Sequence, residues 1–167
     1  RRRIYCYIKK QLQFSTICGR IVVNKNGGIL QMIKIAICDD NKYALDMIKR
    51  CIEQSFKKHN TEFETYCYLN GERLLNDIAM LNFDVIFLDI DLATDISGID
   101  IAKQIRKINK NAYIIFLTAH FEYSMLAYKV KTFDFLVKPI MYSNLEETVL
   151  RLRDDIEDNR NTFVRFN

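Results

Sequence analysis

The chain has 167 residues, enough for one domain with a single core, and its hydrophobic share of 49% excludes an intrinsically disordered protein. Its net charge of +4 is uneven, because residues 1–31 hold seven basic residues and no acid, whereas the remainder holds 18 basic and 21 acidic residues. The basic balance of the whole chain therefore says nothing about the partners of its main part.

The cysteines and the apolar runs bear on the compartment. The five cysteines are odd in number and show no C-x-x-C spacing, so we expect free, mostly buried thiols, which suit a reducing cytoplasm: Cys6, Cys18, Cys38, Cys51 and Cys67. No apolar run approaches the ~20 residues needed to cross a bilayer. The basic start lacks a signal-peptide cleavage pattern. We expect a cytoplasmic protein without a membrane partner.

Residues 1–31 show no clear period and end in the turn signal Asn26-Gly27-Gly28. Met32 directly opens the first predicted strand, as an initiator residue would. One hypothesis is that residues 1–31 are a translated leader outside the fold. The alternative is a genuine basic arm, and the sequence favours neither.

From Met32 onward, apolar runs of strand length alternate with stretches of helical period. The predicted order is strand 34–38, helix 42–58, strand 62–68, helix 71–81, strand 85–89, helix 98–108, strand 113–117, helix 122–129, strand 133–137 and helix 143–158. Five such units predict an α/β fold, a doubly wound, flavodoxin-like five-stranded parallel sheet of order 2-1-3-4-5 with helices on both faces.

Helix starts carry recognisable capping residues. Asn41 and Asn70 stand where N-caps are expected, and Ser143 with Glu146 three residues later resembles a capping box for the last helix. After that helix, Asp158-Asn159-Arg160-Asn161 reads as a polar linker, and the TFVRF run that follows reads as a beginning strand. We therefore expect residues 32–158 to be the main domain and residues 159–167 to lead into a missing C-terminal domain.

Four predicted strands end in reactive polar residues: Asp39-Asp40, Asp89, Thr118 and Lys138-Pro139. Parallel sheets place functional residues at the carboxyl ends of their strands, so these side chains should converge. An acidic pair after one strand is by itself most often a solvated turn. Four such ends in one chain favour a shared site.

The residue types point to magnesium and phosphate. Crowded carboxylates repel one another unless a cation lies between them, and oxygen ligands suit Mg²⁺. One aspartate could then serve as both ligand and nucleophile toward a phosphoryl group. Thr118 could donate its hydroxyl to a phosphoryl oxygen, and Lys138 supplies a flexible positive charge.

In this order the motifs resemble those of the receiver domain of bacterial two-component response regulators, from Met32 to about Asp158. The matching positions are Asp39-Asp40, Asp89, Thr118-Ala119, Phe135 and Lys138-Pro139. Within that family, LDIDLATDISGIDIAKQIRK and LTAHFEY…FDFLVKPI look most like regulators with a LytTR DNA-binding domain. The nearest kin look like the accessory-gene-regulator type that answers peptide quorum signals.

The resemblance implies a role for each matching residue. Asp89 would be the phosphoacceptor. Asp40 and Asp89 would ligate Mg²⁺ with their side chains, Asp39 directly or through water, and Asp91 through its backbone carbonyl. The backbone N–H of Ala119 would join Thr118 and Lys138 around the phosphoryl group, and a cis peptide bond would precede Pro139.

The resemblance also implies a phosphorylation-dependent switch rather than a turnover enzyme. A sensor histidine kinase would donate the phosphoryl group, Thr118 would move inward, and Phe135 would rotate into the space vacated. The face formed by helices 122–129 and 143–158 and strand 133–137 would change and mediate homodimerisation. DNA would be bound only through the missing C-terminal domain.

Two departures from the family pattern affect the site. Many receivers have a proline four residues after the phosphoacceptor, where this chain has Ala93, and the loop to Gly98 is one residue longer than usual. Phe135 also lacks the tyrosine hydroxyl of many receivers.

Two other functions would fit parts of this sequence. Asp89-Ile90-Asp91 resembles the D-x-D motif of haloacid dehalogenase-like phosphatases, but that family needs an acidic pair after a later strand. Here the only later pair, Asp154-Asp155, lies in a charged helix. The second is a receiver fold that binds partners without phosphorylation. The intact set of acids and Lys138 argues against it.

Overall fold

A computed structural model of the chain describes residues 21–23, 29–93, 96–123 and 130–164. The chain divides into two compact units, Arg1–Gln31 and Met32–Asn167. In the first unit, β1 (Ile21–Val23) pairs antiparallel with β2 (Ile29–Gln31). Three-residue strands are too short to show an alternating pattern, which is why the sequence analysis missed them. The Asn26-Gly27-Gly28 turn lies outside the described residues.

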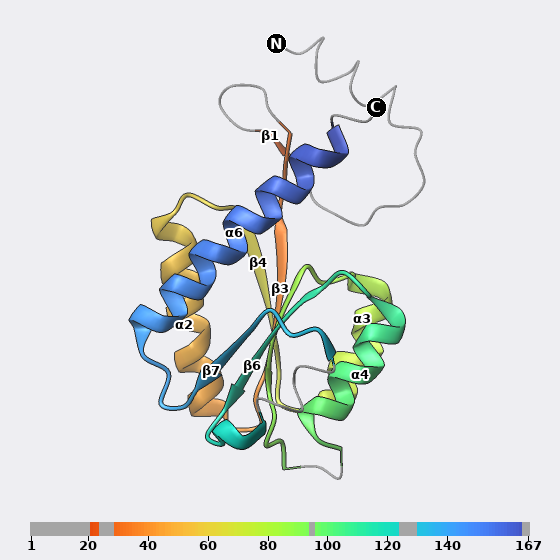
Figure 1. Cartoon of the computed structure of the whole chain (residues 1–167), viewed down its shortest axis with the longest axis vertical. Coiled ribbons are helices and arrows are strands. Elements are labelled where there is room, and N and C mark those ends of the chain that lie inside the picture. Colours follow the sequence, from red (N-terminus) through yellow and green to blue (C-terminus); the bar gives the residue numbers. More distant parts are fainter. Residues whose placement is uncertain (1–20, 24–28, 94–95, 124–129, 165–167) are drawn as a thin grey trace. The chain divides into compact units, whose positions relative to one another are not determined.

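The second unit contains a five-stranded parallel sheet (Figure 1). Its strands are β3 (Ile33–Cys38), β4 (Phe63–Tyr68), β5 (Val85–Asp89), β6 (Tyr113–Thr118) and β7 (Asp134–Val137). They lie in the order β4-β3-β5-β6-β7, and every neighbouring pair is parallel. Counted along the chain within this sheet, that order is 2-1-3-4-5, so the predicted fold class is confirmed.

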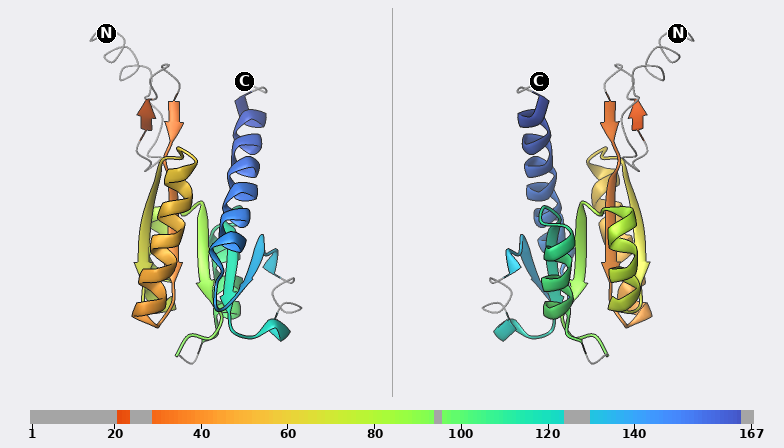
Figure 2. Two further views of the ribbon diagram at one scale, coloured as in Figure 1. Left: turned by 90° about the vertical axis from the view of Figure 1, so that its left-hand side faces the viewer. Right: turned by 90° about the vertical axis from the view of Figure 1, so that its right-hand side faces the viewer.

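Helices cover both faces of the sheet. In the described residues these are α2 (Lys42–Lys58), α3 (Gly71–Leu81), α4 (Gly98–Ile108) and α6 (Tyr142–Val164). Figure 2 shows α2 and α6 in front of the sheet in one view and α3 and α4 in front of it in the other. The helix predicted over 122–129 falls largely on residues 124–129, outside the described residues, and Phe121–Tyr123 forms a 3-10 turn, η1.

Two apolar clusters fill the space between the sheet and the helices. Alternate residues of β3 belong to different clusters: Ile35 and Ile37 pack with α2 and α6, whereas Ala36 and Cys38 pack with α3 and α4. A strand that is buried on both faces reads as a continuous apolar run, which is how the sequence revealed it. On the edge strand β4, Cys67 is exposed, so the prediction of buried thiols is wrong for this residue.

The helix starts test the capping predictions. The Asn41 side chain accepts backbone N–H bonds from Tyr43 and Ala44, and that of Asn70 accepts one from Arg73, so both N-caps are confirmed. The predicted capping box is wrong, because α6 begins at Tyr142, so Ser143 lies inside the first turn and is not the N-cap.

The end of α6 also differs from the prediction. The helix continues through Val164, so residues 159–164 are helical rather than a linker and the start of a strand. Residues 159–164 contain no glycine or proline to stop the helix, and asparagine costs only a few tenths of a kcal/mol there, roughly 0.7 at most.

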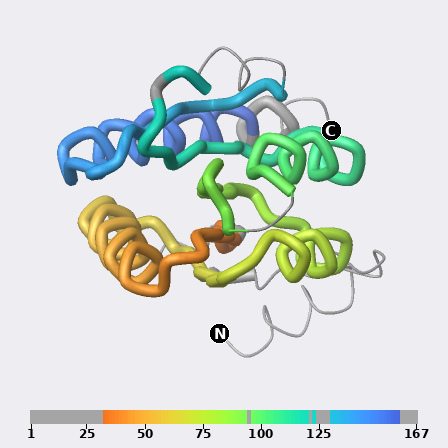
Figure 3. Tube along the Cα trace, turned by 90° about the horizontal axis from the view of Figure 1, so that it is seen from below, coloured from red at the N-terminus to blue at the C-terminus, as the bar shows by residue number. Residues whose placement is uncertain are grey.

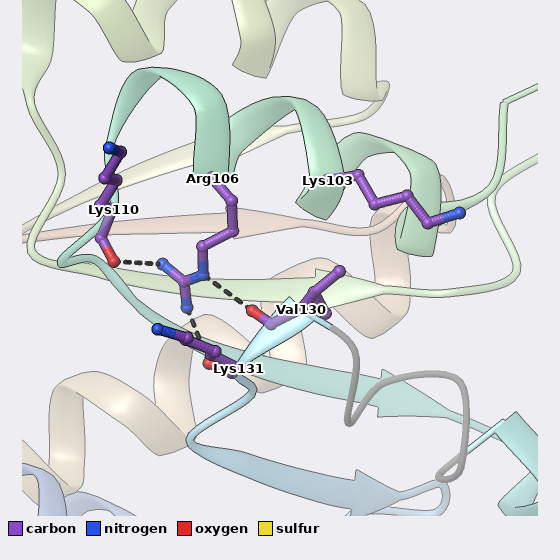
Figure 4. Close-up of a pocket in the computed structure, with 5 residues that line it drawn as sticks. All are labelled: Lys103, Arg106, Lys110, Val130 and Lys131. Carbon is purple, nitrogen blue, oxygen red and sulfur yellow. Dashed lines mark hydrogen bonds between the residues drawn. The ribbon is translucent and has the colours of Figure 1, made fainter.

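Arg106 of α4 forms hydrogen bonds to the segment before β6 and to the segment before β7 (Figure 4). Its guanidinium donates to the carbonyl oxygens of Ala112, Val130 and Lys131 at 2.6, 2.8 and 2.9 Å. With Lys103 and Lys110 it lines a pocket of about 340 Å³. Lys131 also lines the pocket, and Figure 4 shows Lys103 on the opposite side of Arg106 from Lys110 and Lys131, so the three lysines do not converge on one anion site.

Candidate functional site

The carboxyl ends of the parallel strands meet at one end of the sheet, which Figure 3 views from below. Asp39 follows β3, Asp89 ends β5, Thr118 ends β6, and Lys138 follows β7. Since β3 and β5 are neighbours, their aspartates come together, and carboxylate oxygens of Asp39, Asp40 and Asp89 all lie within 4.8 Å of one another.

Lys138 joins two of these carboxylates. Its Nζ lies 2.7 Å from Asp39 Oδ2 and 2.7 Å from Asp89 Oδ2. Asp39 and Asp89 are almost fully buried, whereas about a quarter (24%) of the Lys138 side chain is exposed. Buried charges persist where they are paired and hydrogen-bonded, and Lys138 meets that need for both acids. One ammonium among three carboxylates leaves the site with an excess of negative charge.

The protonation equilibria reflect this crowding. Burial raises the pKa of Asp89 above its usual value, and the hydrogen bond and charge of Lys138 oppose that rise without cancelling it. Burial acts to lower the pKa of Lys138, but the hydrogen bonds and charges of Asp39 and Asp89 outweigh it, so the pKa lies above its usual value. The ammonium therefore stays charged, and Asp89 is the acid whose ionisation is disfavoured.

Backbone N–H groups also donate hydrogen bonds to the three carboxylates. Asn41 donates to Asp39 Oδ1 at 2.9 Å, and Asp91 donates to Asp89 Oδ1 at 3.2 Å. The N–H of Ala93 donates to Asp40 Oδ2 at 2.9 Å. The sequence analysis assigned no such role to Asn41 or Ala93, because a donated backbone N–H leaves no trace in the identity of its residue.

Thr118 is fully buried at the end of β6. Its hydroxyl donates to Asp91 Oδ2 at 3.0 Å and accepts from the backbone N–H of His120, also at 3.0 Å. Ala119, expected to offer its backbone N–H, directly follows Thr118 and is exposed. The resemblance to receivers implied a role only for the backbone carbonyl of Asp91, so the contact between its side chain and Thr118 was not predicted.

The remaining predicted residues lie on or just after β7. Phe135 is partly buried and packs edge-on against Phe116 of β6, with ring centroids 6.5 Å apart, so it belongs to the apolar cluster rather than to the carboxylates. The peptide bond between Lys138 and Pro139 is cis.

The donor set fits a hard divalent cation. The three converging side chains offer only carboxylate oxygens, which are the ligands that Mg²⁺ prefers. A doubly charged ion would also offset the negative charge that Lys138 leaves unbalanced. These residues therefore fit a magnesium ion.

Fold and site together define a receiver domain, and comparison with known proteins agrees. Residues 35–150 match the response regulator receiver domain, and the chain belongs to this family. It is 30% identical over 135 residues to the sensory transduction protein LytT of Bacillus subtilis, covering 78% of this chain and 54% of LytT. It is 34% identical over 124 residues to the transcriptional regulatory protein BtsR of Salmonella typhi, covering 74% of this chain and 49% of BtsR.

These relatives agree with the predicted likeness to LytTR-type regulators. The chain spans about half the length of both relatives. Among solved structures, the response regulatory domain of mrkE from Klebsiella pneumoniae is similar, with a TM-score of 0.68 and 24% identity, covering 75% of this chain and 99% of that one. No helix in the described part of the chain is long and apolar enough to span a membrane.

Proposed function

We propose that this chain is a phosphorylation-dependent switch that accepts a phosphoryl group on Asp89 from a sensor histidine kinase. The observation that carries the proposal is the pairing of buried Asp89 with Lys138, beside Asp39 and Asp40. Asp89 Oδ would form the new O–P bond while the bond between the donor and phosphorus breaks, and the leaving group would take that electron pair.

Each neighbour of Asp89 has a part in this reaction. Asp39, Asp40 and Asp89 would hold Mg²⁺ with their side chains and Asp91 with its backbone carbonyl. Bound Mg²⁺ supplies positive charge that offsets the repulsion between the carboxylates and an incoming phosphoryl group. Lys138, already between Asp39 and Asp89, would follow the phosphoryl oxygens as a flexible point charge.

The output of the switch lies beyond the site. Thr118 and the N–H of Ala119 would bind phosphoryl oxygens, Phe135 would rotate, and the face that includes β7 and α6 would then favour a homodimer. A C-terminal DNA-binding domain of LytTR type, in a cytoplasmic regulator, would read that change. LytT and BtsR, each about twice the length of the match, support the presence of a further domain.

The test is incubation with acetyl phosphate and Mg²⁺, followed by intact-mass measurement. We expect one phosphoryl adduct on the wild-type chain, none on Asp89→Asn, and none when EDTA removes the metal. Asp154→Asn, which removes an exposed carboxylate of α6, is the matched control and should be phosphorylated normally. Repeated turnover of phosphate esters without an adduct would instead indicate a phosphatase.

The oligomeric state tests the output. Sedimentation velocity should show a larger share of dimer for the phosphorylated chain than for the unmodified chain, with Asp89→Asn unchanged by the donor. Identical sedimentation of both forms contradicts the dimer switch while leaving the phosphoacceptor role intact.

A further inference from the structure

The hydroxyl of Thr118 is already in use in the unphosphorylated chain. It donates to Asp91 Oδ2 at 3.0 Å and accepts from the N–H of His120 at 3.0 Å. A threonine hydroxyl has a single proton, so its only donor capacity is directed at Asp91. The acceptor is a carboxylate, and hydrogen bonds to ionised acceptors are stronger than neutral ones.

This contact conflicts with the part of Thr118 in the proposed function. There the same proton must be donated to a phosphoryl oxygen on Asp89, and one proton cannot serve both acceptors. Asp89 does not hold Thr118 in the meantime: its carboxylate accepts from the N–H of Asp91 and from Lys138, while the single proton of Thr118 goes to Asp91. The carboxylate of Asp91 and the phosphoryl group are therefore competitors for one buried hydroxyl.

We propose that the Asp91 carboxylate is a latch on Thr118 that sets how readily the chain switches. Asp91 is thus a positioning residue, acting through Thr118, and the inference rests on the proposed function of Asp89. On phosphorylation the hydrogen bond from Thr118 passes from Asp91 Oδ2 to a phosphoryl oxygen, and no covalent bond changes in this step.

The surroundings of Asp91 make the exchange possible in both directions. Asp91 is exposed, so its carboxylate can turn to water when it releases Thr118. A phosphoryl group on Asp89, two residues away, adds negative charge beside the carboxylate of Asp91 and so favours the release. Loss of the phosphoryl group removes that repulsion, and the latch closes again.

The test measures binding of beryllium trifluoride, a noncovalent mimic of an aspartyl phosphate, to the full chain with Mg²⁺. Asp91→Ala should bind the mimic about tenfold more tightly than wild type, because one charge-assisted hydrogen bond no longer has to be broken. Asp91→Asn, whose amide oxygen is an uncharged acceptor, should bind the mimic with an affinity between those of wild type and Asp91→Ala. Glu72→Gln, which removes an exposed negative charge in the first turn of α3 at the same end of the sheet, should bind like wild type.

A double-mutant cycle with Thr118→Ala separates the latch from a general effect of charge. Without the hydroxyl there is nothing to release, so the gain from Asp91→Ala should then shrink to the part that comes from removing a negative charge beside the mimic. A gain from Asp91→Ala that is equally large in the Thr118→Ala background overturns the latch, as does wild-type affinity in Asp91→Ala. A wild-type chain that takes neither the mimic nor a phosphoryl group overturns the proposed function and the latch together.

Discussion

At the scale of single residues, position within the fold gives similar side chains different properties. Asp39 and Asp89 are almost fully buried and share one ammonium, whereas Asp40 is held by a single backbone N–H in the β5–α4 loop. The residue type alone does not distinguish these aspartates. Their neighbours in the fold distinguish them, because burial and pairing set the free energy of the charged form.

Gly98 shows how closely the loop after β5 approaches the site. A Cβ added there would lie 2.0 Å from the backbone oxygen of Asp89, which cannot move without displacing the strand end. We predict that Gly98→Ala lowers the free energy of unfolding by about 1–3 kcal/mol despite the better helix propensity of alanine. Urea unfolding measures this.

Gly71→Ala is the matched control for that change, because its added Cβ would meet the end of the flexible Ile101 side chain, also at 2.0 Å. We expect a smaller loss for Gly71→Ala than for Gly98→Ala. Equal losses would mean that the β5–α4 loop yields as easily as a side chain.

The thiols offer a second prediction at this scale. Cys38 is buried, and burial, followed by the charges of Asp39, Asp89 and Asp40, raises its pKa to about 12. Cys67 is exposed. With iodoacetamide at a pH of about 8, peptide mapping should find Cys67 alkylated in the native chain and Cys38 alkylated only after unfolding, since the thiolate is the reactive form. Labelling of native Cys38 at the rate of Cys67 would contradict the buried position.

At the scale of elements, local signals placed most boundaries and failed where a tertiary contact or a neighbouring turn competes. Asn41 and Asn70 cap their helices as predicted, because an N-cap depends only on residues two or three positions away. Glu146 instead pairs with Lys58 of α2, 2.6 Å away, and the helix starts before Ser143. A partner 88 residues distant cannot be read from a four-residue motif.

Arg106 provides the prediction for this scale. Its guanidinium ties α4 to the carbonyls of Ala112, Val130 and Lys131, so Arg106→Ala leaves these acceptors without their donor. We expect a loss of roughly 2 kcal/mol in the free energy of unfolding, measured by urea denaturation. Arg106→Lys should recover only a small part, because an ammonium cannot reproduce the planar fork of donors.

Lys103→Ala serves as the control, since this exposed residue of the same helix forms its ion pair with Asp100, which is also exposed. The free energy of unfolding should then change by no more than about 0.5 kcal/mol. A loss of stability in Lys103→Ala as large as that in Arg106→Ala would mean that any truncation in α4 destabilises the fold, rather than the loss of the Arg106 hydrogen bonds.

At the scale of the whole molecule, the fold concentrates negative charge at one end of its sheet. Asp39, Asp40 and Asp89 are held together by the strand order, and Lys138 balances only part of their charge. A ligand that binds only the folded chain stabilises it. Folding and metal binding should therefore be coupled.

We predict that Mg²⁺ raises the midpoint of thermal unfolding. At a hundredfold excess over its dissociation constant, the gain in stability should be about 2.7 kcal/mol. Asp40→Asn should lose most of the shift, while Asp154→Asn should keep it. A shift of the same size in Asp40→Asn would show that Mg²⁺ binds elsewhere.

The sequence by itself determined the five strands of the parallel sheet, most helix bounds and the set of reactive strand ends, because apolar periodicity and N-caps are local and because parallel strands share one end. That one Asp follows β3 and another ends β5 was enough to predict their meeting. Only the tertiary structure decided that Ala93 donates its N–H to Asp40, that Cys67 lies on an exposed edge, and that Asp91 holds Thr118. These depend on the course of loops and on sheet edges, where contacts between distant residues override what each segment prefers alone.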